Sequence, residues 1–450
     1  MALTLPQVVA HFKADVGKAL SAEFIRKTCT NLRINFRERL FTPVLTLHVF
    51  LEQILHGNVA IRALTHLTGL AFTAAAYCEA RQRLPLTFFQ DLLERVVDGL
   101  DGARRSTSLW CGRHRTWFLD GSNFSMPDTP ALQQYFGQPG AQAKGCGFPI
   151  AHILGLFDAQ TGFLQRVLAS PLRTHDMAHA ASMHPEMTAG DILVADRGFA
   201  SFTHLALLLA RNLHGLFRCH QKQIVNFRPG RKHAGQNKPQ KGKPRSRWLK
   251  HLGQRDQLVE YPKPKRKPTW IDTEAYNRLP DHVIVRELRF SVHQRGHRVR
   301  EITLTTTLID PLLYSRQVLA ELYEQRWQVE TNFRHLKTTM KMEVLHCKSV
   351  AGVLKELTMF ALVYNLVRLV MLEASKRQKV PVERVSFIDA LRWLRSATPQ
   401  TPLPDLVINP HRPYRLEPRV AKRRPKPFKL MNKPRAKLRK SLENKACTLK

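Results

Sequence analysis

Residues 322–340, LYEQRWQVETNFRHLKTTM, constrain the fold more than any other stretch, because they contain no Gly or Pro and repeat apolar residues at helical spacing. On a helix turning about 100° per residue, an apolar stripe faces a core and a polar group lies beside it, within about 60°. The polar group is either a functional face about 21 Å long or an ordinary surface ion pair between Arg326 and Glu330. The stripe is Leu322, Val329, Phe333, Leu336 and Met340, and the polar group is Tyr323, Arg326, Glu330 and Lys337.

The spacing YxxRxxxExxxxxxK, with Trp327 directly after the Arg, is specific enough to suggest a family. It resembles the signature helix of the insertion-sequence transposases of family four. These are bacterial cut-and-paste enzymes with an active site of two Asp and one Glu. The resemblance implies two partner Asp residues upstream of Glu330, each in its own motif.

Two upstream acids fit that pattern. Asp120 ends an apolar run in WFLDGSNFSMPDT, and Asp196 ends another in ILVADRGF; both match the family's motifs. Phosphodiester hydrolysis uses two Mg²⁺ ions about 3.5 to 4 Å apart, which carboxylates suit better than His or Cys. We therefore expect Asp120, Asp196 and Glu330 to be catalytic metal ligands for Mg²⁺, with Mn²⁺ as a substitute. Asp128 is expected to cap a helix instead. Asp176 either caps a helix or approaches the metals, and the cap is favoured.

The rest of the polar face suits DNA. Tyr323, Arg326 and Lys337 flank Glu330 and are expected to hold phosphates near the scissile bond, Arg by its bidentate fork and Lys as a point charge. Trp327 lies about 40° beyond this face. It either stacks on a DNA base or packs against the sheet, and the angle favours packing.

Charge points to the same partner. The chain has 71 Lys and Arg against 35 Asp and Glu, a formal net charge of +36. Self-repulsion opposes compaction unless a polyanion is bound, so double-stranded DNA is the expected partner. Apolar runs at residues 44–55 and 357–372 are interrupted and short for a bilayer, so we expect buried helices and no membrane partner. Scattered cysteines and the lack of a secretion signal indicate a reducing cytoplasm. The resemblance implies that this cytoplasm is bacterial, with the protein at the nucleoid.

Composition and pattern divide the chain into five segments. Residues 1–105 are helical, and residues 106–220 give three strands followed by alternating strand and helix. Residues 221–300 are a basic, β-rich insertion with a flexible loop. Residues 301–400 contain the signature helix, and residues 401–450 form a basic, disordered tail whose prolines oppose regular helix. Together with the resemblance, this order predicts an α/β fold: a ribonuclease H-like catalytic core with a mixed sheet, interrupted by the insertion and preceded by an α-helical N-terminal domain.

The cations of the N-terminal segment have two interpretations. They bind DNA at the element's ends, as the corresponding domain does in the resembled family, or they form the solvated face of a small bundle. No helix-turn-helix spacing identifies a recognition helix. These cations are Arg26, Lys27, Arg33, Arg37, Arg39, Arg62, Arg81 and Arg83.

The sequence therefore predicts a DNA transposase that cleaves element ends and transfers strands into target DNA. Joining two ends to one target implies a homodimer in the synaptic complex. Two alternatives stay open: a nuclease of the same fold that cuts without strand transfer, and a non-catalytic DNA-binding derivative.

Overall fold

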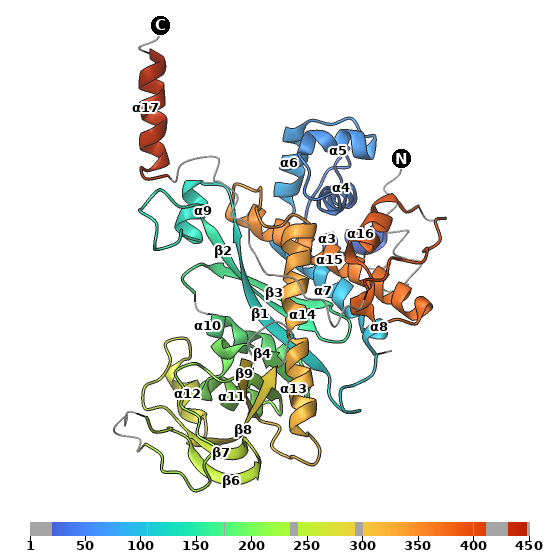
Figure 1. Cartoon of the computed structure of the whole chain (residues 1–450). Helices are drawn as coiled ribbons and strands as arrows, with labels where there is room; N and C mark the ends of the chain where they lie inside the picture. The colour runs from blue at the N-terminus through green and yellow to red at the C-terminus, as the bar shows by residue number, and fades with distance from the viewer. Residues whose placement is uncertain are drawn as a thin grey trace.

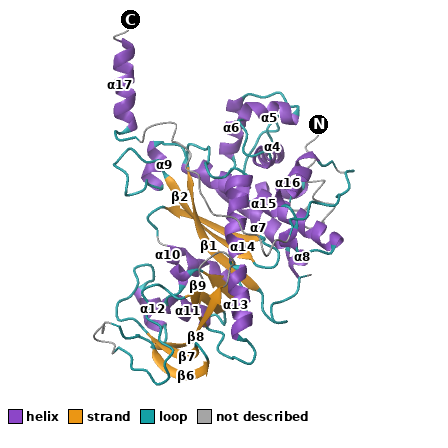
Figure 2. Cartoon of the chain, in the orientation of Figure 1, coloured by secondary structure: helices purple, strands orange, loops and turns teal. Residues whose placement is uncertain are grey.

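A single nine-stranded mixed sheet runs through the fold in the order β3-β2-β1-β4-β5-β9-β8-β7-β6 (Figures 1 and 2). β1 lies antiparallel to β2 and parallel to β4, and β5 is parallel to β4. The computed structural model describes residues 20–105, 107–174, 176–234, 242–292, 300–398, 400–410 and 431–447. The strands are β1 Thr116–Ser125, β2 Ile150–Asp158, β3 Leu164–Pro171, β4 Ile192–Ala195, β5 His214–Arg218, β6 Arg247–Gly253, β7 Asp256–Pro262, β8 His282–Val292 and β9 Arg300–Thr306.

β1 is longer than its apolar run. We expected the strand to end at Asp120, but it continues to Ser125 and pairs with β2 along that whole length. The prediction was wrong because the second half of β1, DGSNFS, is polar and only partly buried, so its sequence lacks the apolar alternation of a strand. Backbone pairing with β2, which no local pattern reports, keeps it extended.

The predicted insertion is β-rich, but its strands extend the central sheet. β9 pairs with β5, and β8, β7 and β6 follow in antiparallel order. The flexible loop expected inside the insertion stays a prediction, while two hydrogen bonds join its residues 226 and 231 to residues 246 and 257. Arg231 donates to the Ser246 carbonyl at 2.7 Å, and the Gln257 amide donates to the Asn226 carbonyl at 3.0 Å. Residues 235–241, and the predicted hairpin turn at residues 294–298, lie outside the described residues.

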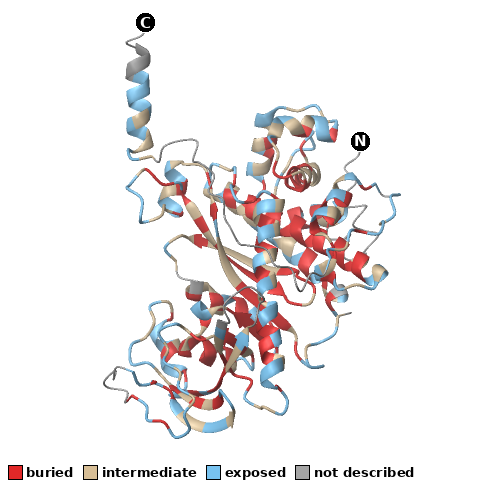
Figure 3. Cartoon of the chain, viewed as in Figure 1, coloured by how far each residue is buried: buried red, intermediate tan, exposed pale blue. Residues whose placement is uncertain are grey.

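Helices surround the sheet, and the long helix α15 (Val350–Gln378) is the centre of the core (Figure 3). By length and composition it is apolar enough to cross a membrane, yet 94% of its most apolar window is buried inside the protein. The N-terminal helices are α3 Ala22–Asn31, α4 Pro43–Leu55, α5 Ile61–Thr68, α6 Ala74–Arg83, α7 Leu86–Gly99 and α8 Asp101–Arg105. The others are α9 Pro130–Tyr135, α10 Asp176–Ala180, η1 Ala181–Glu186, η2 Arg197–Phe199, α11 Phe202–Leu209, α12 Thr273–Arg278, η4 Val382–Arg384 and α16 Phe387–Ser396.

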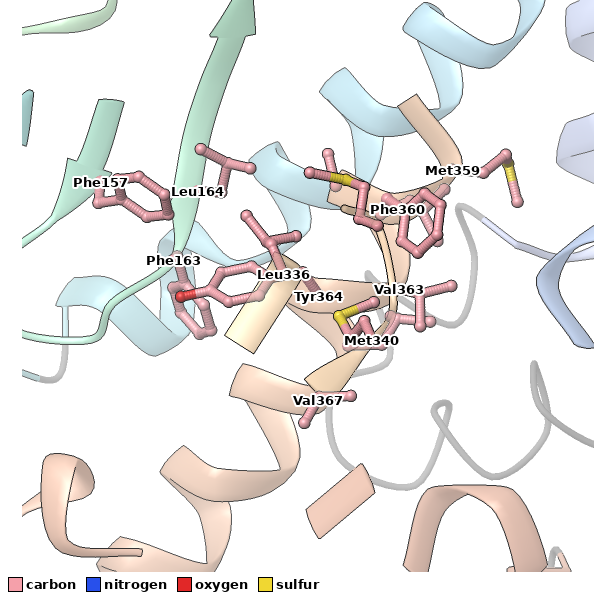
Figure 4. Packing of buried hydrophobic residues seen from close by; sticks show 14 of the residues in the cluster. Phe157, Phe163, Leu164, Leu336, Met340, Met359, Phe360, Val363, Tyr364 and Val367 are labelled. Atoms are coloured by element: carbon pink, nitrogen blue, oxygen red, sulfur yellow. The ribbon is translucent and has the colours of Figure 1, made fainter. Parts of the chain in front are cut away.

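The signature segment is helical but interrupted. It comprises α13 (Arg316–Gln325), α14 (Trp327–Arg334) and the π-helical turn η3 (His335–Thr339). Arg326 stands at the first break, where hydrogen bonds tighten to three-residue spacing. The predicted apolar stripe is confirmed, because all five of its residues are buried. Figure 4 shows Leu336 and Met340 packed near Tyr364 of α15.

The C-terminal segment also differs from the expectation. Regular helix was excluded after Pro410, but α17 (Arg435–Cys447) is a helix that extends away from the body in Figure 1. The last proline, Pro434, directly precedes this helix, and proline opposes only the helix it interrupts. Residues 411–430 lie outside the described residues.

Candidate active site

Sheet register brings the two candidate Asp residues together. Ala195, the last residue of β4, pairs with Leu119 of β1. Asp196 therefore follows β4 beside Asp120 on the neighbouring strand, and neighbouring strands lie about 4.8 Å apart. Asp196 directly precedes the short turn η2. Both carboxylates are thus fixed by backbone pairing.

A glycine on β2 lets the signature helix approach this point. Gly155 lies directly opposite Asp120 in the sheet. A Cβ at position 155 would come within 3.1 Å of the Phe333 ring of α14. The same Phe333 ring meets Phe157 edge to face, with ring centroids 5.3 Å apart. Gly155 therefore allows the helix that carries Glu330 to pack close to the strand that carries Asp120.

The three carboxylates surround Arg326 and Tyr323. One terminal nitrogen of Arg326 lies 3.5 Å from Asp120, and the other lies 3.0 Å from Glu330. The Tyr323 hydroxyl donates to Asp196 over 3.5 Å. The structure thus brings five predicted site residues into one group. The alternative of an ordinary surface ion pair between Arg326 and Glu330 is therefore incomplete. Arg326 also pairs with a second carboxylate, that of Asp120 on β1.

Burial sets the protonation of this group. The Asp120 side chain is 25% exposed, and burial raises its pKa to about 6. The Gly121 N–H and Arg326 lower this pKa, while the charges of Asp196 and Glu330 raise it. Burial likewise raises the pKa of Tyr323 to about 12, so the phenol keeps its proton as a donor. Asp120 is therefore mostly ionised at neutral pH and half protonated near pH 6.

Two predicted DNA contacts lie at the edges of this group. The Lys337 ammonium is 5.4 Å from the centre of the Phe124 ring, four residues beyond Asp120 on β1. Trp327 is 58% exposed, so the favoured interpretation of packing against the sheet is wrong. Its break position after Arg326 turns the indole toward solvent. The exposed ring is available to stack on a DNA base.

The other acids have different partners from those expected. Thr129, not Asp128, caps α9 by accepting from the Leu132 N–H at 3.3 Å. Asp128 instead accepts from Arg435 at 2.8 Å, a link to α17. Asp176 is the first residue of α10; its capping role stays a prediction. Gly155 was missed, although an isolated Gly in the apolar run AHILGLFD signals close backbone approach.

The donor set fits a hard cation. Asp120, Asp196 and Glu330 offer only carboxylate oxygens, which Mg²⁺ prefers. Within the described residues, no group of three or more His, Cys, Asp or Glu side chains is close enough to hold a metal ion. Arg326 lies between two of the three acids and partly neutralises them. The residues therefore suit Mg²⁺ chemically.

Carboxylates on adjacent strands, beside a helix bearing Arg and Lys, define a class of enzymes that act on nucleic acid phosphodiesters. Residues 112–366 match the family model of the transposase DDE domain. The chain belongs to that family and is a DNA transposase, and the resemblance to family-four enzymes is confirmed.

Three known proteins give the range of similarity. The chain is 23% identical over 374 residues to the transposase InsG of insertion sequence element IS4 from Escherichia coli K12, covering 78% of this chain and 77% of InsG. It is 26% identical over 145 residues to the putative transposase InsZ of the same organism, covering 32% of this chain and 47% of InsZ. A cryo-EM structure of the piggyBac transposase synaptic complex with hairpin DNA aligns at a TM-score of 0.44 and 10% identity, covering 86% of this chain and 78% of that one.

Proposed function

We propose that Asp120, Asp196 and Glu330 form the active site for cleavage at the element's ends and for strand transfer. The observation that carries this proposal is the convergence of these acids on Arg326 and Tyr323. The core has a ribonuclease H-like arrangement: three antiparallel strands, then two parallel strands on the other side of β1. The strand order β3-β2-β1-β4-β5 supports this assignment.

The same three acids would hold Mg²⁺, or Mn²⁺ in its place. When bound, a pair of such ions makes the attacking water nucleophilic and stabilises the departing 3′ oxygen. The chain's own residues position the DNA around them. Arg326 exchanges its carboxylate contacts for a phosphate, Tyr323 orients Asp196 through its hydroxyl, and Lys337 binds a phosphate farther along the strand.

Duplex DNA is the proposed partner, both as element end and as target. The exposed Trp327 supplies a stacking surface beside the acids. Two ends must reach one target, so a homodimeric synaptic complex follows. The protein would act on nucleoid DNA in a bacterial cytoplasm, where the free thiols of the described residues suit reducing conditions.

Glu330→Gln tests the proposal. The substrate is a labelled duplex with the DNA that flanks this gene, incubated with Mg²⁺ and a second, target duplex. We expect wild type to nick one end position and join it to the target. The variant should bind equally but lose about a thousandfold in rate, because it keeps the size of Glu330 and removes the ligand charge.

The alternatives give different results in that assay. Cutting without joining would indicate a plain nuclease. Equal binding without cutting, in Mg²⁺ and in Mn²⁺, would indicate a non-catalytic derivative. A Glu330→Gln protein as active as wild type would remove Glu330 from the site. Glu324→Gln, an exposed acid on the same segment, is the matched control and should cut normally.

The contact that holds α17 gives a further prediction about DNA affinity. Arg435 pairs with Asp128 at 2.8 Å and lies 3.8 Å from the centre of the Phe148 ring. This fixes one end of a helix whose cations Lys437, Arg439 and Lys440 are exposed. We expect Arg435→Asp to release the helix and reduce the salt dependence of duplex binding by about two to three phosphate contacts. The plot of log affinity against log salt measures this.

The charge-swapped protein is the control for that experiment. Asp128→Arg combined with Arg435→Asp re-forms the pair in reverse and should restore the wild-type salt slope. An unchanged slope in the single variant would mean that α17 does not contact DNA.

A further inference from the structure

A cavity of about 630 Å³ lies between the N-terminal helices and the segment that leads into α15. Its volume is in the range of cavities that bind small molecules. One wall comes from the end of α4 to the start of α5 and from α6; the opposite wall is formed by residues 346–349 and the first turns of α15. The cavity is separate from the three carboxylates of the active site, none of which lines it.

The cavity floor is held by a network of satisfied polar groups. The Glu356 carboxylate accepts from the backbone N–H groups of His346 and Cys347 at 2.8 and 2.9 Å, and from the Asn58 amide at 2.5 Å. The Lys355 ammonium donates to the Arg81 carbonyl at 3.1 Å. Because these contacts join both walls, the cavity is preformed. The negative charge of Glu356 is already compensated within the wall.

Three cations, Arg81, Lys348 and Lys355, line the cavity with Glu356, and side chains hold Arg81 in place. The Arg81 guanidinium stacks on the Phe50 ring, 3.8 Å from the centre, and donates to the Gln53 side chain and the Cys347 sulfur. The solvated interpretation of this cation was therefore wrong: Arg81 faces the cavity rather than bulk water. Lys348 adds an exposed cation at the rim.

The remaining lining matches the two halves of a nucleotide. Val59 and Ile61 provide apolar surface, and Gln82 provides an amide able to bond a base edge. The Gln53 amide already bonds Val59, Tyr77 and Arg81. Arg81 and Lys348 suit a phosphate. A purely apolar ligand would leave the Gln82 amide and the cations unused, and inorganic phosphate alone would leave most of the volume unfilled.

The position relative to the acids agrees with a DNA strand. From Asp120, β1 runs past Phe124, where Lys337 lies, to Ser125, which bridges to Val344. Five strand residues cover about 17 Å, and duplex DNA rises about 3.4 Å per base step. Two residues after Val344 the cavity lining begins at His346. A strand leaving the acids along β1 would thus reach Ser125 after about five steps and the cavity after about seven.

We propose that this cavity binds a single nucleotide, either an unpaired nucleotide of the bound DNA strand or a free one. The strand source rests on the proposed transposase function, while nucleotide binding itself does not. Ala351, on the exposed first turn of α15, lines the cavity and allows it to be filled.

The first test uses a free probe, deoxyadenosine monophosphate labelled with a methylanthraniloyl fluorophore. Wild type and Ala351→Ser should bind it alike, since both leave the cavity open. Ala351→Trp should bind it about tenfold more weakly or worse, a loss of about 1.4 kcal/mol per tenfold. Thermal unfolding checks that the Trp variant folds. If it does not, Gln82→Ala replaces it, with an expected weakening of about threefold.

The second test uses the duplex of the cleavage assay with 2-aminopurine at single positions three to seven steps from the cut. Fluorescence should rise at one position with wild type and Ala351→Ser, and not with Ala351→Trp. A response to the free probe alone identifies a free nucleotide as the ligand, and a response of the duplex alone identifies the strand. If wild type cuts DNA and neither probe responds, the nucleotide site is wrong and the transposase function stands. If Ala351→Trp blocks probe binding but wild type does not cut DNA, the nucleotide site stands and the transposase function is wrong.

Discussion

Asp120→Asn is expected to abolish DNA cleavage and, at pH 7.5, to raise the free energy of unfolding by about 3 kcal/mol. The stability gain follows from a raised pKa. Burial lifts the pKa of Asp120 from 3.8 to about 6. A shift of roughly two units corresponds to about 3 kcal/mol at 1.36 kcal/mol per unit. Above pH 6 the folded protein carries a carboxylate that its surroundings disfavour, and Asn removes that charge.

The sign of the pH dependence checks this cause. Between pH 3.8 and pH 6 the folded state binds more protons at Asp120 than the unfolded state, so wild-type stability falls as pH rises. The advantage of Asn should therefore be about half as large at pH 5 as at pH 7.5 and vanish toward pH 3.8. Urea unfolding followed by tryptophan fluorescence measures the difference. The exposed Asp98→Asn should change stability by less than about 0.5 kcal/mol at any of these pH values.

The activity loss should be larger for Asp120 than for Glu330. We expect about ten-thousandfold, because Asp120 lies near both Asp196 and Glu330 and is one of the three acids that would hold the metal ions. Variant protein that is less stable than wild type at pH 7.5 would mean that Asp120 is well solvated, or paired more tightly than its 3.5 Å contact with Arg326 indicates. A charged ligand such as Asp120 lowers the stability of the fold, and such a cost is typical of functional sites.

Local sequence pattern correctly predicted the burial of residues that recur at regular spacing along one helix. The apolar stripe of the signature segment follows helical spacing, and all its members are buried. The acids Asp120 and Asp196 were found from motif and resemblance, and sheet register then placed them side by side. Sequence order could not reveal that register, because the pairing of β1 with β4 joins residues more than 70 positions apart.

The errors share a physical cause, which is that distant contacts override local preference. β1 extends through a polar segment because β2 pairs with it. The signature helix breaks at Arg326, the residue that reaches both Asp120 and Glu330. Trp327 is exposed once that break rotates the chain. These three departures from the expected pattern lie at the candidate site, where local regularity gives way to the placement of charged groups.

The second large effect is expected on stability, at Arg286 in the β-rich insertion. Arg286→Met should lower the free energy of unfolding by about 3 to 5 kcal/mol, the usual loss when one member of a buried ion pair is removed. Arg286 is 1% exposed and donates from Nε to Asp256 of β7 at 2.8 Å. It also donates to the Tyr314 carbonyl at 2.6 Å, just before α13. The variant therefore leaves the Asp256 carboxylate buried without a countercharge.

A double variant separates the charge from the packing. Arg286→Met with Asp256→Leu removes both charges and should recover most of the loss, because burying an ion pair is seldom better than burying apolar groups of similar size. Urea midpoints of wild type, single and double variants give the three values. A single variant within about 1 kcal/mol of wild type would mean that Asp256 reaches water despite its 5% exposure.

The rate of DNA cleavage shows whether the insertion positions the active site. Tyr314 accepts from Arg286 through its carbonyl, and its hydroxyl lies 2.6 Å from His114, which precedes β1. The pair thus connects the insertion to the start of α13, the helix that contains Tyr323 and is followed by Arg326, and to the strand of Asp120. If the insertion positions the site, the double variant should be stable yet cut DNA more slowly, since the anchor at Tyr314 is lost. A stable double variant with wild-type cleavage would show that β5 and β9 pairing alone is enough to hold α13 in place.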